Sequence, residues 1–243
     1  DVAYLSLSRP AGTLAKSGQG DDAKSMLSLI AENIADRNSG FKNLVITDSS
    51  GNIVYEYEDI QGMKESFFGF EELEGYSEGS TKISKIYMNN EDYETSVFYV
   101  AKSIDADGLN NIDGFAIEII DLSKISEILS KTSYGEGKGY LSVTDGTGCV
   151  LNYEGNAVQK IDDIADSGIR DVMKSTVKPT SAENNIDYNV GGKLGCYNYF
   201  TGASSLNWKW VSVYPANIAM SQIAVPLAIS LGTMVVLAVI CAL

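Results

Sequence analysis

Aromatic side chains are concentrated in the first half of the chain, between residues 55 and 99. Ring faces attract cations, and one carboxylate beside them would complete a site for an amine or another cationic ligand. Asp105, which follows soon afterwards, is a candidate for that carboxylate. The alternative is that half of the rings alternate into a hydrophobic core and the others cover the surface. The aromatic residues concerned are Tyr55, Tyr57, Phe67, Phe68, Tyr76, Tyr87, Tyr93, Phe98 and Tyr99.

The sequence offers no residues for the common catalytic chemistries. It contains no His, which excludes Ser-His-Asp and Cys-His nucleophiles and His-ligated zinc. In residues 105–113 the glycine and the bidentate glutamate of an EF-hand loop are misplaced, so a hairpin turn is expected there instead of a calcium site. Glu71, Glu72 and Glu74 are interpreted as a solvated acidic edge, since nothing positions a substrate between them. We therefore expect no enzyme activity, no metal and no cofactor.

The charge of the chain limits its partners. The formal net charge is −14, and such an acidic surface repels phosphate backbones. Nucleic acid is therefore excluded as a partner. The same surface makes no electrostatic bond with anionic lipid, so any attachment to a membrane has to be apolar.

The C-terminal end supplies such an apolar segment. Residues 211–243 contain no charged side chain, and residues 224–243 are almost wholly apolar. About 20 residues at roughly 1.5 Å each reach the thickness of a bilayer's hydrocarbon core. We predict a transmembrane helix over residues 219–243, since the alternative, a buried core helix, is seldom this long without a polar face. The chain begins at Asp1 without Met and ends within this segment, so we expect it to be an excerpt of a longer protein.

The predicted elements occur twice in the same order. Apolar residues at helical spacing predict a helix over residues 21–38. Two strand-like runs then flank a polar turn in FKNLVITDSSGNIVYEYE, and further strands follow. GYLSVTDGTGCVLNYEG begins the same order again: strand, turn, strand, helix and three strands. Two segments of about 90 residues predict the duplication of an α+β unit with an antiparallel sheet.

In the order of these segments the chain resembles the extracytoplasmic double Cache sensors of bacterial transmembrane receptors, in which two PAS-like modules stack along a long N-terminal helix. The resemblance is carried by VITDSSGNIV, ISKIY, GFAIEIIDLSKI, KGYLSVTDGTGCVLNYEG and the closing NWKWVSVYP. It implies an N-terminal helix in residues 1–40, a membrane-distal module in 41–130, a membrane-proximal module in 131–218 and the transmembrane helix in 219–243.

The resemblance also implies where a ligand binds. In this family the distal module usually holds the ligand, and the amino-acid-binding subgroup suggests Tyr87 as the pocket tyrosine and Asp105 as the acceptor of the ligand ammonium. Phe67 or Phe68 stands for the family's Trp, but the Arg that grips the α-carboxylate in a bidentate manner is missing. The candidate ligand-binding residues, for an amine or amino-acid-like ligand, are Tyr87, Asp105, Phe67, Phe68, Tyr55 and Tyr99.

Two cysteines test the implied fold. In a PAS-like sheet of strand order 2-1-5-4-3, Cys149 lies on the second strand and Cys196 on the fourth. Three strand spacings of about 4.8 Å separate them by roughly 14 Å, beyond the reach of a disulfide. We expect both cysteines to be reduced and buried.

The leading hypothesis is a small-molecule-sensing region of a bacterial transmembrane signalling receptor, of the chemoreceptor, diguanylate cyclase or histidine kinase type. The ligand would bind the distal module, and the signal would pass through the membrane helix. Residues 1 to about 218 would then lie outside the bacterial cell membrane, and a homodimer is expected. The alternative is a membrane-anchored surface interaction or adhesion protein whose two repeats are structural spacers.

Overall fold

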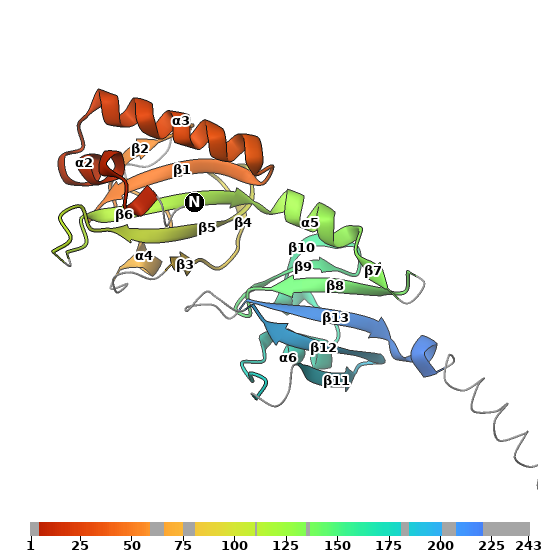
Figure 1. The fold of residues 1–243 in the computed structure, drawn as a ribbon. Coiled ribbons are helices and arrows are strands. Elements are labelled where there is room, and N and C mark those ends of the chain that lie inside the picture. Colours follow the sequence, from red (N-terminus) through yellow and green to blue (C-terminus); the bar gives the residue numbers. More distant parts are fainter. Residues whose placement is uncertain are drawn as a thin grey trace, which may run out of the picture.

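The computed structural model describes two antiparallel sheets with flanking helices, in agreement with the predicted α+β class (Figure 1). Its described residues are 5–58, 66–74, 81–109, 111–134, 137–180, 185–200 and 208–220. Within these ranges no helix is long and apolar enough to cross a membrane. The predicted transmembrane segment, residues 219–243, lies outside them except for its first two positions.

The first sheet has six strands in the order β2-β1-β6-β5-β3, with β4 also paired to β5. Its elements are β1 (Phe41–Asp48), β2 (Ile53–Glu56), α4 (Phe70–Leu73), β3 (Thr81–Ile83), β4 (Tyr87–Asn90), β5 (Thr95–Ile104) and β6 (Gly114–Asp121). The predicted turn joins β1 to β2, and Asp48 Oδ1 accepts hydrogen bonds from the backbone N–H groups of Ser50 and Asn52 at 2.8 and 2.9 Å. This local bonding fixes the register of the hairpin.

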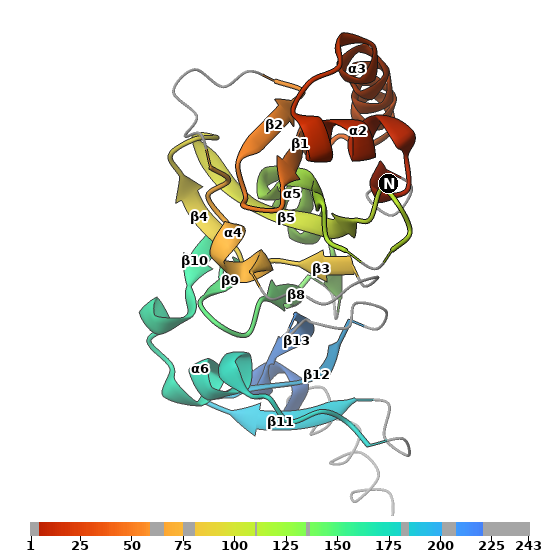
Figure 2. The same ribbon diagram turned by 90° about the vertical axis from the view of Figure 1, so that its left-hand side faces the viewer.

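Two helices lie together on one face of the first sheet (Figures 1 and 2). They are α2 (Arg9–Ser17) and α3 (Asp21–Arg37), so the helix predicted over residues 21–38 is confirmed. The single long helix expected in residues 1–40 is not found. Gly18, with φ 64°, ends α2 and donates its N–H to the carbonyl oxygen of Leu14 at 2.7 Å. This left-handed helix end is favoured by glycine and divides the segment in two.

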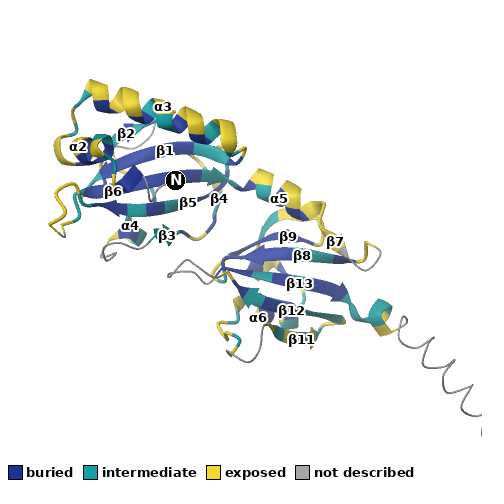
Figure 3. Cartoon of the chain, viewed as in Figure 1, coloured by how far each residue is buried: buried dark blue, intermediate teal, exposed yellow. Residues whose placement is uncertain are grey.

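The first sheet separates two hydrophobic cores. On the helix side, Leu27 of α3 belongs to one core with Leu44 and Ile46 of β1. On the α4 side, Val45 belongs to a second core with Ile117 of β6. Neighbouring residues of β1 thus point to opposite faces, as the period of a strand requires. Figure 3 shows the central strands buried and the outer face of α3 exposed.

The helix α5 (Leu122–Ser130) connects the first sheet to the second, and Asp121 caps it by accepting a hydrogen bond from Ser123 N–H at 2.7 Å. The second sheet has the order β10-β9-β8-β13-β12-β11, with β7 paired to β8. Its elements are β7 (Ser133–Tyr134), β8 (Gly139–Thr144), β9 (Cys149–Tyr153), β10 (Asn156–Lys160), the 3-10 helix η1 (Ile161–Asp163), α6 (Ser167–Lys174), β11 (Ile186–Val190), β12 (Lys193–Tyr199) and β13 (Lys209–Pro215). Apart from additional edge strands, both sheets have the predicted PAS-like strand order.

The two cysteines lie on the predicted strands and are both free. Cys149 is on β9 and Cys196 on β12, with β8 and β13 between them. Cys149 is buried, but Cys196 is only half-buried, so the prediction that both are buried is wrong for Cys196. The reason is its place on β12, which pairs with the half-buried edge strand β11.

Candidate ligand-binding site

Five aromatic rings gather on the α4 side of the first sheet, and we call them the aromatic cluster. The ring centroids of Phe68 and Tyr87 are 4.8 Å apart at an interplanar angle of 87°. Those of Phe67 and Tyr99 are 5.1 Å apart at 74°. Such edge-to-face pairs place the positive edge of one ring against the negative face of the next. The aromatic cluster consists of Phe67, Phe68, Tyr87, Tyr93 and Tyr99.

Gly69 allows this cluster to close. The hydroxyl of Tyr99 donates a hydrogen bond to the Gly69 carbonyl oxygen at 2.9 Å. A Cβ atom on Gly69 would lie 2.4 Å from Cε1 of Tyr99 and 3.1 Å from the hydroxyl oxygen of Tyr87. Because an aromatic ring cannot yield as a flexible chain end does, this position requires a residue without a side chain.

One edge of the aromatic cluster carries charges. The Tyr87 hydroxyl donates a hydrogen bond to Glu72 Oε1 at 2.5 Å. Lys85 Nζ lies 3.2 Å from the same carboxylate oxygen and 5.2 Å from the centroid of the Tyr87 ring. The side chain of Glu72 is 25% exposed and that of Lys85 is 53% exposed, so this group faces solvent. We call Glu72, Lys85 and Tyr87 the polar edge.

The tyrosines of the cluster are neutral hydrogen-bonding groups. Burial raises the pKa of Tyr87, Tyr93 and Tyr99 far above the usual range, and the Glu72 carboxylate raises the pKa of Tyr87 and Tyr99 further. Their hydroxyls therefore keep their protons at physiological pH. The negative charge at the polar edge is that of Glu72.

The structure brings four of the six predicted site residues together: Phe67, Phe68, Tyr87 and Tyr99 all belong to the aromatic cluster. Tyr55 is not among them, because it belongs to the core on the helix side of the sheet. Its hydroxyl lies 3.1 Å from Oγ of Ser28 on α3. Burial raises its pKa as well. Tyr55 thus joins β2 to α3 on the face opposite the cluster.

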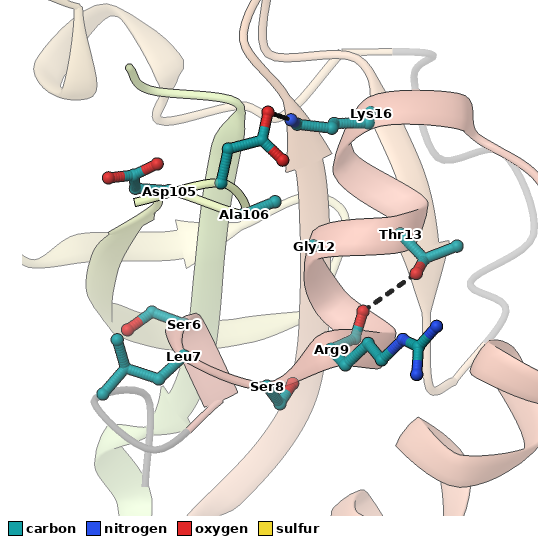
Figure 4. Close-up of a pocket in the computed structure, with 10 residues that line it drawn as sticks. Ser6, Leu7, Ser8, Arg9, Gly12, Thr13, Lys16, Asp105 and Ala106 are labelled. Carbon is teal, nitrogen blue, oxygen red and sulfur yellow. Dashed lines mark hydrogen bonds and ion pairs between the residues drawn. The ribbon is translucent and has the colours of Figure 1, made fainter. Parts of the chain in front are cut away.

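Asp105 also lies away from the aromatic cluster. Tyr87 pairs with Val97 near the start of β5, whereas Asp105 follows the last residue of that strand. Eight residues at about 3.3 Å each separate the two positions by roughly 26 Å along the strand. Asp105 lines a cleft of about 330 Å³ beside α2, where Lys16 pairs with Asp107 (Figure 4). Its Oδ1 accepts a hydrogen bond from Leu109 N–H at 3.2 Å.

Sequence reasoning missed two residues of the polar edge. Glu72 was expected on a solvated acidic edge, but its carboxylate accepts a hydrogen bond from Tyr87 and pairs with Lys85. Only Glu71 and Glu74 are exposed as expected. The sequence signal for Glu72 is slight: it precedes the buried Leu73 in a helix of four residues, too short for a periodic pattern to assign its faces. Nothing in the sequence distinguishes Lys85 from other lysines.

Three solved structures have a fold similar to that of this chain. A Pseudomonas fluorescens chemoreceptor ligand-binding domain, CtaA with L-isoleucine, matches with a TM-score of 0.58 and 15% identity, over 90% of this chain and 85% of that one. A domain of a putative sensory box/GGDEF family protein from Vibrio parahaemolyticus matches with a TM-score of 0.61 and 11% identity, over 88% and 86%. The extracellular domain of the putative histidine kinase mmHK1S-Z2 matches with a TM-score of 0.57 and 14% identity, over 89% and 90%.

Comparison of sequences adds nothing to these matches. No protein-family model matches the chain. No curated protein matches it either. At such low identities the structural likeness concerns the fold alone, which this chain shares with these three domains. The two antiparallel sheets agree with the tandem PAS-like modules that the resemblance to double Cache sensors implies, whereas its long N-terminal helix is not confirmed.

Proposed function

We propose that this chain is the extracytoplasmic small-molecule-sensing region of a bacterial transmembrane signalling receptor. Its ligand carries an amine and binds at the polar edge of the aromatic cluster, in the module formed by residues 41–130. Residues 131–218 form the membrane-proximal module, and residues 219–243 cross the membrane. The chain carries out no catalytic step in this role, and it assembles as a homodimer.

One observation carries the choice of ligand: an ammonium group of the protein itself occupies the polar edge. Lys85 Nζ lies 3.2 Å from Glu72 Oε1 and 5.2 Å from the centre of the Tyr87 ring. A carboxylate and a ring face are the two contacts by which proteins recognise amines. Since Lys85 is half exposed and its ion pair is correspondingly weak, a ligand amine displaces it at little cost.

The module of residues 41–130 contains no Arg, and this disfavours ligands that depend on a carboxylate for binding. The arginines of the chain are Arg9, Arg37 and Arg170, and none of them lies in residues 41–130. A ligand α-carboxylate is therefore without its usual bidentate partner in this module. Amines without a carboxylate are expected to bind at least as well as amino acids. The chemoreceptor domain cited above holds L-isoleucine, which carries both groups.

A thermal-unfolding screen of the chain in detergent micelles tests this proposal. The panel contains primary amines, quaternary ammonium ions, amino acids and carboxylates without an amine. A ligand at 100 times its Kd stabilises the folded state by about 2.7 kcal/mol, enough to raise the melting temperature by several degrees. We expect amines to raise it and plain carboxylates to leave it unchanged. If only carboxylate-bearing compounds shift the melting temperature, the amine assignment is wrong.

A further inference from the structure

The residues between β3 and β4 contact both the candidate site and the second module. We propose that this segment, Ser84–Ile86, is the mechanical coupling between them, so that a displacement at the polar edge changes the contact of the segment with Trp208 of the second module. That this coupling carries a signal rests on the proposed function. The contacts of Ser84–Ile86 themselves are present without any ligand. Figures 1 and 2 show β3 on the side of the first sheet that faces the second sheet.

Toward the site, the segment is bonded to the strand that carries Tyr99. Ser84 is fully buried, and its N–H donates to the carbonyl oxygen of Tyr99 at 2.9 Å. Tyr99 N–H donates in return to Ser84 Oγ at 2.9 Å. The next two residues are Lys85, which pairs with Glu72, and Ile86, which precedes Tyr87. The segment is therefore continuous with the polar edge in both sequence and hydrogen bonding.

Toward the second module, the same segment makes two buried hydrogen bonds. Trp208 Nε1–H donates to the Ser84 carbonyl oxygen at 2.9 Å. Ile86 N–H donates to Asp145 Oδ2 at 3.1 Å. The other oxygen of Asp145 accepts from the N–H groups of the β8–β9 turn, including that of Cys149 at 3.0 Å. Because these N–H groups hold the Asp145 carboxylate in place, the carboxylate fixes the position of the Ile86 N–H and does not move with it.

Apolar side chains from both modules surround these bonds. The rings of Phe98 and Trp208 have centroids 5.0 Å apart. Ile86 and Phe98 of the first module share one buried core with Leu151 and Trp208 of the second. Water is therefore kept from the hydrogen bonds, and a buried donor or acceptor that loses its partner is costly. Since Ile86 is anchored to Asp145, movement of the segment is transmitted to Trp208 instead of being absorbed by solvent.

Trp208 is well placed to pass such a movement on. It directly precedes β13 (Lys209–Pro215), a strand in the middle of the second sheet, after which the chain continues towards its C-terminal end. The predicted route is therefore short: polar edge, Ser84–Ile86, Trp208 and β13.

Hydrogen exchange of the full chain in detergent micelles, without any ligand, tests the coupling. Trp208→Phe removes the indole N–H but keeps an apolar ring. We expect the amides of Tyr99 and Ile86 in the first module to exchange at least about fivefold faster, as for the loss of one buried hydrogen bond. Trp210→Phe, two residues further along the chain on β13, is the matched control and should change these rates less than about twofold. The buried Leu44 amide, which donates to Asn43 Oδ1 at 2.8 Å, reports whether the first module stays folded.

Coupling in the other direction, from the polar edge to Trp208, is tested with Tyr87→Phe, which removes only the hydroxyl bonded to Glu72. We expect the exchange of Trp208 Nε1–H to change in this variant and to stay unchanged in Tyr55→Phe, on the opposite face. Unchanged Tyr99 and Ile86 amides in Trp208→Phe, with Leu44 still protected, would overturn the coupling. So would an unresponsive Trp208 in Tyr87→Phe. Neither result depends on amine binding, so failure of the coupling and failure of the proposed ligand class are distinguishable.

Discussion

In the proposed site, the Glu72 carboxylate determines which class of ligand the aromatic cluster would bind. Rings alone suit an apolar ligand, whereas a carboxylate beside a ring face favours a cation. The sequence allowed Phe67, Phe68, Tyr87 and Tyr99 to be named as candidates, because aromatic residues are concentrated there, and the structure brings them together. Their role in ligand binding stays a prediction. The acidic residue of the site, Glu72, could not be predicted from the sequence. Asp105 is next to the aromatic run in sequence, but β5 carries it to the far end of the sheet, whereas the turn before α4 brings Glu72 to Tyr87.

A buried lysine in the second module is expected to make the stability of the protein depend on pH. Lys209 is fully buried, and its Nζ donates to the carbonyl oxygens of Val172 and Ser175 at 2.7 and 2.6 Å, at the end of α6. It also lies 4.8 Å from the centre of the Tyr197 ring. These groups stabilise a positive charge at the negative end of the helix dipole. Burial nevertheless lowers the pKa of Lys209 from 10.5 to about 8.

The lowered pKa gives a signed prediction for stability. Between pH 8 and 10.5 the unfolded chain binds the lysine proton more firmly than the folded chain, so this group's contribution to the free energy of unfolding rises with pH. Lys209→Met removes this contribution. We therefore expect the stability of wild type relative to Lys209→Met, measured by denaturant unfolding at pH 7 and pH 9.5, to be greater at pH 9.5. An equal difference at both pH values would contradict the shift.

At the scale of elements, α4 depends on Gly69. Gly69→Ala places a methyl group 2.4 Å from Tyr99 Cε1, so the rings or the turn have to move. Overpacking of this kind costs about 1–3 kcal/mol. We expect the variant to lose that much unfolding free energy in denaturant melts and to bind amines more weakly. Gly148→Ala is the control, because a Cβ there meets nothing within 4 Å. Equal stabilities of the two variants would show that the cluster is not closely packed at Gly69.

The N-terminal helices show how far sequence patterns define elements. The apolar spacing of residues 21–38 identified α3, and Leu27 and Ile34 of the predicted apolar face are buried, whereas Met26, which the same spacing placed on that face, is exposed. The division from α2 was missed, although Gly18 and Gly20 are strong helix-ending residues, because the family resemblance favoured one continuous helix. The local signal was correct here, since a residue at φ 64° interrupts a helix whatever packs beside it.

At the scale of the molecule, the duplication was visible in the sequence but the junction was not. Repeated strand–turn–strand patterns predicted two antiparallel sheets, because alternation and turn residues are local signals. The junction joins Ser84 to Trp208, 124 residues further along the chain. A contact between residues so far apart in the chain produces no periodic pattern in a single sequence. Its serine and tryptophan are recognisable only when the two sheets are placed side by side.

The central claim, that Glu72 and the ring of Tyr87 bind an amine, is tested most directly by titration calorimetry. The chain in micelles is titrated with the amine that raises its melting temperature most. We predict that Glu72→Gln weakens binding about 10- to 100-fold, as expected for the loss of a charge-assisted hydrogen bond, while Tyr55→Phe binds like wild type. Wild-type affinity in Glu72→Gln, with the protein folded, would contradict the account.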